Sequence, residues 1–250
     1  WPAGRVCSGG FGVGDLDLGA IDHAFILAAG RGERMRPLTR LAPKPLLPLG
    51  GRSLLRRALD HCAAAGVARA TVNAHHRAGA LAAHLAAPHP VATTLAFERT
   101  LLDTGGGIAA RTADFGGRDF FVLAGDALWD GPALPRLAAA WDPARMDILI
   151  LLQPVAAMRA TRGVGDYDLG PDGRAVRSRD KAGAYMFTSL RVNRAAIFDG
   201  APAGAFSYLE LLDAAQAAGR LYGLAHNGPW EHVSTPADLA AVRRPGILNA

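Results

Sequence analysis

Residues suited to phosphate chemistry are concentrated in a glycine-rich stretch near the start of the chain. An apolar run ending at Ala29 is followed by Gly30-Arg31-Gly32-Glu33-Arg34. Glycines let backbone N–H groups approach phosphate oxygens closely, and successive N–H groups form a concavity that binds anions. The forked guanidinium groups of Arg34 and Arg36 could neutralise the oxygens of a triphosphate. The stretch therefore predicts a loop that binds a triphosphate.

Lys44 is the next residue of interest, because the chain holds only one other lysine, Lys181, and uses arginine everywhere else. Pro43 and Pro45 stiffen the backbone on both sides of Lys44 and hold its ammonium group in place. The stretch lacks the Gly-Lys-Ser/Thr ending of a Walker loop. It also differs from a dinucleotide-binding loop, because charged residues follow the first glycine too early.

A carboxylate and a histidine are the candidates for a metal site. Asp126 ends an apolar run, residues 119–126, that is typical of a buried strand. A carboxylate at the carboxyl end of a central strand is well placed to hold Mg²⁺ beside phosphate groups. Capping of the next segment is the alternative role for Asp126. His232 lies near Trp230, and two roles stay open for it, metal ligand or structural side chain.

The elements that must position these residues alternate between strands and helices. Helical spacing, a serine at the start and Gly66 at the end predict a helix over residues 53–65. Strands are expected over residues 24–29, 70–75, 91–97, 119–126 and 147–152, and further helices over 78–86, 106–112 and 132–140. This alternation predicts an α/β fold, a Rossmann-like, mostly parallel sheet flanked by helices.

The second half of the chain has a different pattern. Residues 166–177 predict a hairpin with Asp172-Gly173 at its turn. Strands are expected over 184–192 and 221–225, and helices over 208–218 and 236–243. We therefore expect a small β-rich segment, appended to the nucleotide-binding half, that supplies a pocket for the sugar.

Length and composition predict one domain. The chain has 250 residues, half of them hydrophobic, enough for one buried core. Residues 1–23 are predicted to be a flexible tail and residues 24–245 the domain; Gly10, Gly12 and Gly14 in the tail lack the strand and helix of a dinucleotide site. The first residues lack a basic start followed by an apolar stretch, so no secretory signal is expected. No apolar run has the roughly 20 residues that a membrane helix needs. A cytoplasmic location is expected.

The formal net charge of +5 has two explanations. Nucleic-acid binding would gather the basic residues into a stripe with aromatic side chains between them, and here they are scattered. Phosphorylated small molecules benefit equally from a positive potential. We expect small phosphorylated partners, no nucleic acid and no membrane. The oligomeric state is left open, as a monomer or a small homo-oligomer.

At this point the chain resembles a known family. The run from Gly30 to Thr39, followed by Pro43-Lys44-Pro45, resembles the sugar-1-phosphate nucleotidyltransferases, of nucleotide-diphospho-sugar transferase or GT-A-like fold. Within that family, residues 102–108 (LDTGGGI) and 230–236 (WEHVSTP) look most like the uridylyltransferases of bacterial cell-wall recycling that act on N-acetylmuramic acid 1-phosphate. The resemblance covers roughly residues 24–242.

The resemblance implies roles for individual residues. Arg34, Lys44 and Asp126 would be catalytic, with Asp126 holding Mg²⁺. A further set would bind the nucleotide: Ala28, Ala29, Gly30, Gly32, Asn73, Thr104, Gly105 and Gly106. Residues 105–107 also allow a simpler interpretation as a helix-entry turn. Gly165 and Asp166 would meet the sugar.

The chain departs from the family pattern in two places. Before Asp126 it has Ala124-Gly125 where an Asn or Ser is common, and the second place is near His232. The family usually has Asp where this chain has His232, and Gly where it has Ser234. That Asp is expected to be a second metal ligand, and imidazole suits softer ions than Mg²⁺. Three outcomes are open: the site depends on Asp126 and the phosphates, it prefers Mn²⁺, or its activity is weakened.

The sequence thus predicts transfer of a nucleotidyl group from a nucleoside triphosphate to a sugar 1-phosphate, with pyrophosphate as the second product. UTP and N-acetylmuramic acid 1-phosphate are the expected substrates. One alternative is guanylyl transfer to mannose 1-phosphate on the same scaffold. A second is a non-catalytic sensor that binds a nucleotide sugar, which His232 would favour.

Overall fold

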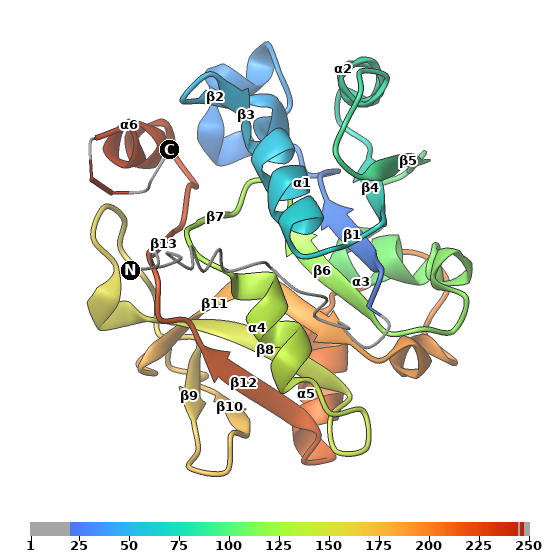
Figure 1. The fold of residues 1–250 in the computed structure, drawn as a ribbon, viewed down its shortest axis with the longest axis vertical. Helices are drawn as coiled ribbons and strands as arrows, with labels where there is room; N and C mark the ends of the chain where they lie inside the picture. The colour runs from blue at the N-terminus through green and yellow to red at the C-terminus, as the bar shows by residue number, and fades with distance from the viewer. Residues whose placement is uncertain (1–20, 245, 248–250) are drawn as a thin grey trace, which may run out of the picture.

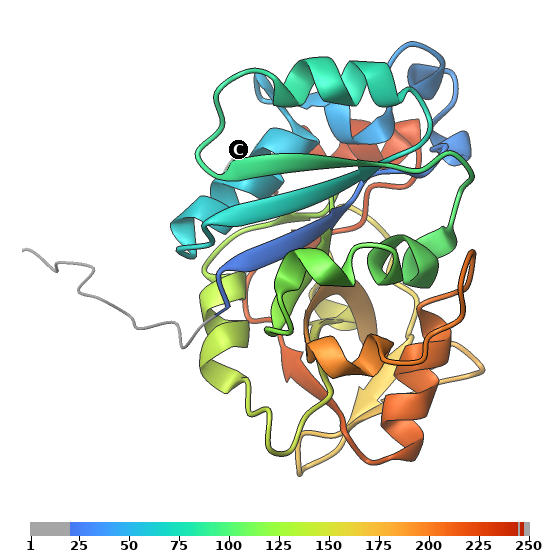
Figure 2. The same ribbon diagram turned by 90° about the vertical axis from the view of Figure 1, so that its right-hand side faces the viewer.

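The computed structural model describes residues 21–244, 246 and 247, and it contains one large sheet covered by helices on both faces (Figures 1 and 2). The predicted tail and its three glycines lie outside the described residues, apart from residues 21–23. Ile21 is buried in the core, and the first strand begins at His23.

Nine strands of the described residues form the main sheet, and their path runs in the order β10-β9-β11-β6-β1-β4-β5, while β8 pairs with β11 and β12. They are β1 (His23–Leu27), β4 (Arg69–Ala74), β5 (Ala92–Phe97), β6 (Phe120–Ala124), β8 (Ile148–Pro154), β9 (Tyr167–Leu169), β10 (Ala175–Arg177), β11 (Tyr185–Asn193) and β12 (Leu221–Ala225). The four short strands pair as β2 (Pro48–Leu49) with β3 (Arg52–Ser53), and β7 (Leu128–Trp129) with β13 (Trp230–Glu231).

Five of the six α-helices among the described residues form two covering layers, and the last packs in a separate small cluster. The six are α1 (Leu54–Ala64), α2 (Ala78–Leu85), α3 (Asp103–Ala109), α4 (Ala133–Ala140), α5 (Leu209–Ala217) and α6 (Pro236–Val242). Side chains of α1, α2 and α4 pack into one hydrophobic cluster, and those of α3 and α5 pack into a second. Figure 1 shows α1 and α4 in front of the sheet. No helix among the described residues has the length and hydrophobicity needed to cross a membrane.

The parallel part of the sheet is the part that the sequence predicts. β1 pairs in parallel with β4 and with β6, and β4 pairs in parallel with β5. In α1, the Ser53 side chain accepts a hydrogen bond from the Arg56 N–H, so Ser53 is the N-cap that its position suggests. Predicted and observed elements otherwise differ by a few residues at their ends, the largest shift being α3, which begins at Asp103.

The β-rich second half is integrated into this sheet instead of forming an appended unit. β11 lies antiparallel between β6 and β8, so it belongs to the centre of the molecule. Only the predicted hairpin, β9 with β10, lies at the edge. The carboxyl ends of β1, β4 and β6 therefore lie at the same edge of the sheet, next to the middle of β11. That edge is where the glycine-rich loop emerges.

Candidate active site

The glycine-rich loop leaves β1 at Leu27 and is held at its start by Asn73 from β4. Asn73 Oδ1 accepts hydrogen bonds from the backbone N–H groups of Ala28, at 2.6 Å, and Ala29, at 3.2 Å. These two N–H groups are therefore occupied by a protein partner. Asn73 is buried, so water does not compete for this contact. The loop starts from a fixed position.

The next N–H groups of the loop are free. Among the described residues, the backbone N–H groups of residues 30–34 donate no hydrogen bond. Gly32 has φ +60°, and a Cβ there would meet Thr39 Cγ2 at 2.9 Å, so packing requires glycine. At Gly30 a Cβ would meet no protein atom within 4 Å, so nothing inside the protein explains that glycine. An open run of N–H donors is what an anion-binding loop presents.

Lys44 and Asp126 form an ion pair beside this loop. Lys44 Nζ contacts Asp126 Oδ2, and both side chains are largely buried, 14% and 23% exposed. Pro43 is extended and Pro45 lies in the first turn of the 3₁₀ helix η3 (Lys44–Leu46), so the backbone at Lys44 is rigid. Asp126 follows β6, two residues after Ala124. The carboxyl group therefore lies within reach of the loop that bears Lys44.

These residues border one cavity of about 570 Å³. Nine predicted site residues line it: Ala28, Ala29, Gly30, Gly32, Arg34, Lys44, Asn73, Thr104 and Asp126. Six residues that the sequence analysis did not assign also line it: Leu27, Pro45, Leu101, Asp103, Ala124 and Ser189. A cavity of this size at the carboxyl ends of parallel strands suits a nucleotide.

Glu98 is a buried side chain beside the candidate site that sequence reasoning missed. It is buried at the end of β5, where its Oε1 accepts a hydrogen bond from Asn73 Nδ2 at 2.7 Å. Its Oε2 accepts the N–H of Leu102 at 3.1 Å. Asn73 and Glu98 therefore join the loop after β1 to the segment before α3, the two walls of the cavity. Its place directly after a predicted parallel strand was the available signal.

Two strained residues line the same cavity. Asp103 has a backbone φ of +58° and Ser189 one of +69°, values that are uncommon for residues other than glycine. Ser189 lies where the pairing of β11 with β8 shifts register, between Phe187 and Arg191. The Thr188 hydroxyl repairs this irregularity, since it donates to the Leu151 carbonyl and accepts the Leu190 N–H. Strain and bulges of this kind concentrate at functional sites.

The glycines of the predicted LDTGGGI motif lie inside α3. Gly105 and Gly106 are buried, and both N–H groups donate to the Phe206 carbonyl. A Cβ at Gly105 would meet Phe206 at 2.4 Å, so packing accounts for that glycine. Thr104 borders the cavity, and its hydroxyl accepts the N–H of Tyr208. Contact of the two glycines with a nucleotide stays a prediction.

His232 lies near the Lys44–Asp126 pair without lining the cavity. Burial lowers the pKa of His232, and the positive charges of Lys44 and Arg34 lower it further. The His232 backbone N–H donates to Thr161 Oγ1 at 3.1 Å, and its Nε2 meets the Ser234 hydroxyl. The imidazole is thus held as a neutral ring beside the site.

Gly165 and Asp166 lie at the base of the hairpin and do not line the cavity. Asp166 accepts a hydrogen bond from Lys181 Nζ at 2.6 Å and one from the Phe187 N–H at 3.1 Å. A Cβ at Gly165 would meet the Gly183 carbonyl at 1.9 Å, so close packing explains this glycine. The structure does not bring these two residues to the loop, and their contact with a sugar stays a prediction.

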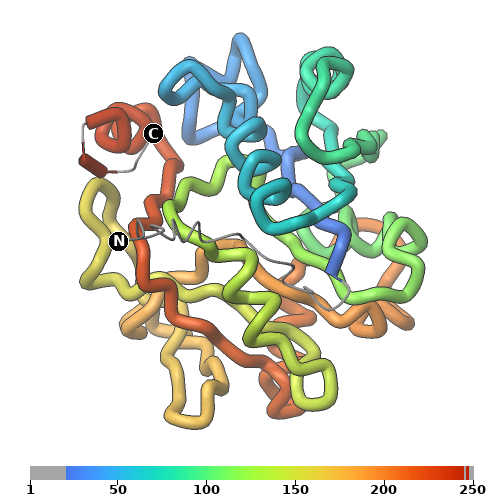
Figure 3. Tube along the Cα trace, in the orientation of Figure 1, coloured from blue at the N-terminus to red at the C-terminus, as the bar shows by residue number. Residues whose placement is uncertain are grey.

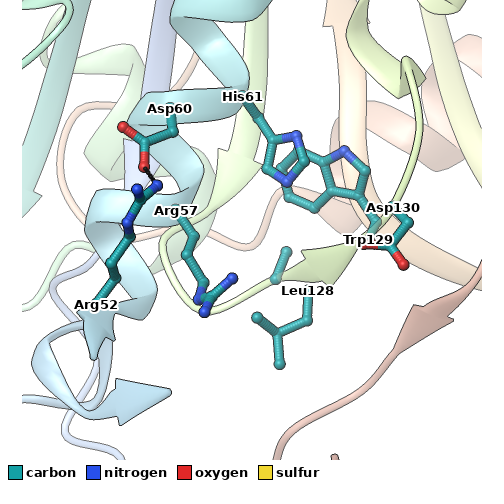
Figure 4. Close-up of a pocket in the computed structure, with 8 residues that line it drawn as sticks. Arg52, Arg57, Asp60, His61, Leu128, Trp129 and Asp130 are labelled. Atoms are coloured by element: carbon teal, nitrogen blue, oxygen red, sulfur yellow. Dashed lines mark hydrogen bonds and ion pairs between the residues drawn. The ribbon is translucent and has the colours of Figure 1, made fainter. Parts of the chain in front are cut away.

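A second cavity, of about 230 Å³, lies between α1 and β7 (Figure 4). Its charged groups are largely occupied by protein partners: Arg52 pairs with Asp60 at 2.9 Å, and Arg57 donates to the Leu49 carbonyl at 2.7 Å. The His61 ring stacks on the Trp129 indole with centroids 4.2 Å apart, as Figure 4 shows. The stacked rings and paired charges describe packing between two elements, and nothing here marks a reaction site.

Comparison with known proteins agrees with the geometry. The family model described as MobA-like NTP transferase domain matches residues 24–195. The chain is 38% identical over 232 residues to the N-acetylmuramate alpha-1-phosphate uridylyltransferase of Caulobacter vibrioides, covering 88% of this chain and 96% of that protein. It is 28% identical to the mannose-1-phosphate guanylyltransferase of Mycobacterium tuberculosis, covering 86% of this chain and 62% of that protein.

Solved structures share the fold. The inositol-1-phosphate CTP transferase from T. maritima superimposes with a TM-score of 0.73 at 18% identity, over 91% of this chain and 98% of that one. The predicted architecture is confirmed: a mixed, largely parallel sheet flanked by helices, as in nucleotidyltransferases of the nucleotide-diphospho-sugar transferase fold.

Proposed function

The chain belongs to the MobA-like NTP transferase family and is a sugar-1-phosphate nucleotidyltransferase, and from that premise we propose that it transfers a uridylyl group from UTP to N-acetylmuramic acid 1-phosphate. One observation carries the proposal most directly. The free N–H groups of residues 30–34 open beside the Lys44–Asp126 pair, on the wall of a cavity large enough for a nucleotide.

The loop and two cations would hold the triphosphate. The free N–H groups and Arg34 are suited to the outer phosphates, and Lys44 to the oxygens around the α-phosphorus. A phosphate oxygen of the sugar phosphate then attacks the α-phosphorus in line. The new P–O bond forms as the bond from the α-phosphorus to its bridging oxygen breaks, and pyrophosphate leaves. Positioning and charge neutralisation are the main contributions of the protein.

The donor set fits Mg²⁺ through a single carboxylate. Mg²⁺ is commonly bound by one or two carboxylates together with phosphate oxygens of the substrate. Asp126 supplies that carboxylate at the cavity wall. No group of three or more His, Cys, Asp or Glu side chains that could hold a metal ion lies within the described residues, so phosphates would complete the coordination. When bound, the ion neutralises charge on the phosphates.

His232 is the less suitable second ligand in this scheme. Its Nε2 is engaged by Ser234, and a neutral nitrogen suits softer ions, Mn²⁺ included, better than Mg²⁺. We therefore assign the metal first to Asp126, with His232 as a neighbour that contributes no charge. A cytoplasmic location, where UTP is available, belongs to the same proposal.

The guanylyl alternative has weaker support. Similarity to the guanylyltransferase is lower, and the alignment covers less of that protein, than for the uridylyltransferase. His232 is the feature that favours a non-catalytic sensor, whereas the loop that bears Arg34 and the Lys44–Asp126 pair favour catalysis.

Purified protein should be incubated with each of UTP, GTP, CTP and ATP against a panel of sugar 1-phosphates in Mg²⁺, with release of pyrophosphate followed. We expect the highest kcat/KM with UTP and N-acetylmuramic acid 1-phosphate. Activity with GTP and mannose 1-phosphate alone would replace this substrate assignment with the guanylyl alternative.

A further inference from the structure

A strongly basic cavity lies on the other side of the glycine-rich loop. It has a volume of about 330 Å³ and is lined by Arg31, Arg36, Thr39, Arg40, His76 and Arg77. Four of these six residues are arginines. None of the residues that line the nucleotide cavity borders it. It is therefore a separate site with its own charge.

The positive charge of this cavity is poorly balanced by the protein. Among the described residues, Arg31 and Arg36 pair with one carboxylate, that of Glu33, at 3.9 and 3.7 Å, and these exposed pairs are weak. Within the described residues, Arg40 and Arg77 form no ion pair with a carboxylate. Like charges held together repel, so an anion that neutralises them binds favourably. Guanidinium groups offer forked donors that match phosphate oxygens.

The backbone around the cavity is arranged to bring these arginines together. Arg77 has φ +54°, which is uncommon for arginine, and its guanidinium donates to the Arg40 carbonyl. His76 Nε2 lies 3.5 Å from the Thr39 carbonyl, and the His76 N–H donates to the Ala29 carbonyl. The connection between β4 and α2 is thus fastened to the loop after β1.

A hydrogen bond links a residue that lines the basic cavity, Thr39, to one that lines the nucleotide cavity, Gly32. The Thr39 hydroxyl donates to the Gly32 carbonyl at 2.8 Å and joins the two ends of the turn. Gly30, Gly32 and Arg34 border the nucleotide cavity, while Arg31 and Arg36 border the basic one. The excursion of the chain after β1 can be followed in Figure 3. A ligand on either side would contact the same short loop.

We propose that this basic cavity is a second oligophosphate site, distinct from the nucleotide cavity. Its ligand is either free pyrophosphate or the phosphate tail of a second nucleoside triphosphate, which share the same chemistry. A small polyanion fits a concave site of four arginines. Because the glycine-rich loop lines both cavities, an anion bound in the basic cavity contacts the same loop that holds the first triphosphate.

Isothermal titration with pyrophosphate, and separately with UTP, tests this without any acceptor or turnover. The wild-type protein should bind two equivalents of pyrophosphate. Arg40→Gln/Arg77→Gln should lose one site, with at least a tenfold weaker affinity, and keep the other. Arg118→Gln/Arg244→Gln removes the same charge elsewhere and should keep both. Two equivalents of UTP would identify a nucleotide tail as a ligand, and one equivalent would restrict the site to pyrophosphate.

A single equivalent of pyrophosphate on the wild-type protein would overturn the proposal, as would two sites retained by Arg40→Gln/Arg77→Gln. The wild-type stoichiometry decides the matter even if that variant does not fold, and Arg36→Gln, at an exposed position, gives a second variant. Arg34→Gln/Lys44→Met should lose the other site. Because no sugar phosphate is present, a wrong assignment of the acceptor leaves this result unchanged.

Discussion

Lys44 differs from arginine in that its ammonium group is compact and contacts a single carboxylate oxygen, Oδ2 of Asp126. The Lys44 side chain is 14% exposed. In the proposed scheme Lys44 lies between Asp126 and a phosphate, a place that a wider, planar guanidinium would not fit. This is the physical reason why one of the two lysines of so arginine-rich a chain lies here.

Replacement of Lys44 should therefore lower the rate of the chemical step. We expect Lys44→Met to reduce kcat/KM by about 10²–10³-fold, the usual cost of removing one donor aimed at transition-state charge. Lys44→Arg should fall by a similar factor, despite its conserved charge. Release of pyrophosphate measures both, and circular dichroism checks the fold. Wild-type activity in Lys44→Arg would show that charge alone suffices.

His232 offers a direct test of the metal. An aspartate at this position would add a second hard oxygen ligand near Asp126. We expect His232→Asp to reach half-maximal activity at a Mg²⁺ concentration about tenfold lower, an order-of-magnitude estimate equal to roughly 1.4 kcal/mol. Ser234→Ala is the matched control, since it removes the partner of the imidazole without adding a ligand. An unchanged Mg²⁺ requirement would assign His232 a structural role.

At the scale of elements, the cavity depends on a buried tie between strands. Asn73 from β4 and Glu98 from β5 hold the loop after β1 and the segment before α3 in one arrangement. Their polar atoms satisfy each other away from water, and removal of one leaves the other unpaired. The two walls of the cavity should therefore move together.

Glu98→Ala tests this tie. Loss of its two hydrogen bonds leaves Asn73 Nδ2 and the Leu102 N–H unsatisfied, which costs about 1–3 kcal/mol each. We expect lower unfolding free energy and a higher KM for the nucleoside triphosphate, with a smaller change in kcat. Glu98→Gln keeps one acceptor and should be intermediate. A large loss of kcat with an unchanged KM would instead argue for direct participation of Glu98 in catalysis.

Sequence patterns predicted the parallel elements well, because local rules decide them. The apolar run from Ala24 and the serine before α1 determine only the structure of the residues next to them. β11 was harder, since a strand pattern carries no information about its partners, and only the folded chain places it between β6 and β8. Ser189 had no signal, because its role depends on an irregularity of that pairing.

The lining of the cavity was predictable in part. Gly30, Arg34 and Lys44 share one short stretch, and all three line the cavity. The side-chain contacts made by other predicted residues across the fold were not predictable. Gly105 faces Phe206 and Asp166 faces Lys181, partners far enough away in sequence that no local pattern reveals them.

At the scale of the whole molecule, five of the eight histidines share one property. Burial is the first cause that lowers the pKa of each of them: His23, His61, His84, His226 and His232. The unfolded chain takes up protons below pH about 6.5, whereas the folded chain resists them. The contribution of these histidines to the free energy of unfolding is therefore greatest above that pH and decreases as the pH falls.

The free energy of unfolding should therefore decrease as the pH is lowered from 7.5 to 5.5. Aspartates with lowered pKa values, such as Asp238, would lose their contribution only at lower pH, near 4 and below. Urea denaturation at several pH values measures the decline, and His226→Gln should reduce it by removing one of the five groups. A free energy that stays level or rises over this range would contradict the assignment.

We propose that this loop and Asp126 hold a nucleoside triphosphate for in-line attack by a sugar phosphate. UTP carrying ³²P at the α-phosphorus, incubated with N-acetylmuramic acid 1-phosphate and Mg²⁺, allows the transferred group to be followed. We expect the label in the nucleotide-diphospho-sugar, with unlabelled pyrophosphate released and no label on the protein. Label found attached to the protein, or left in UTP with every sugar phosphate offered, would contradict it.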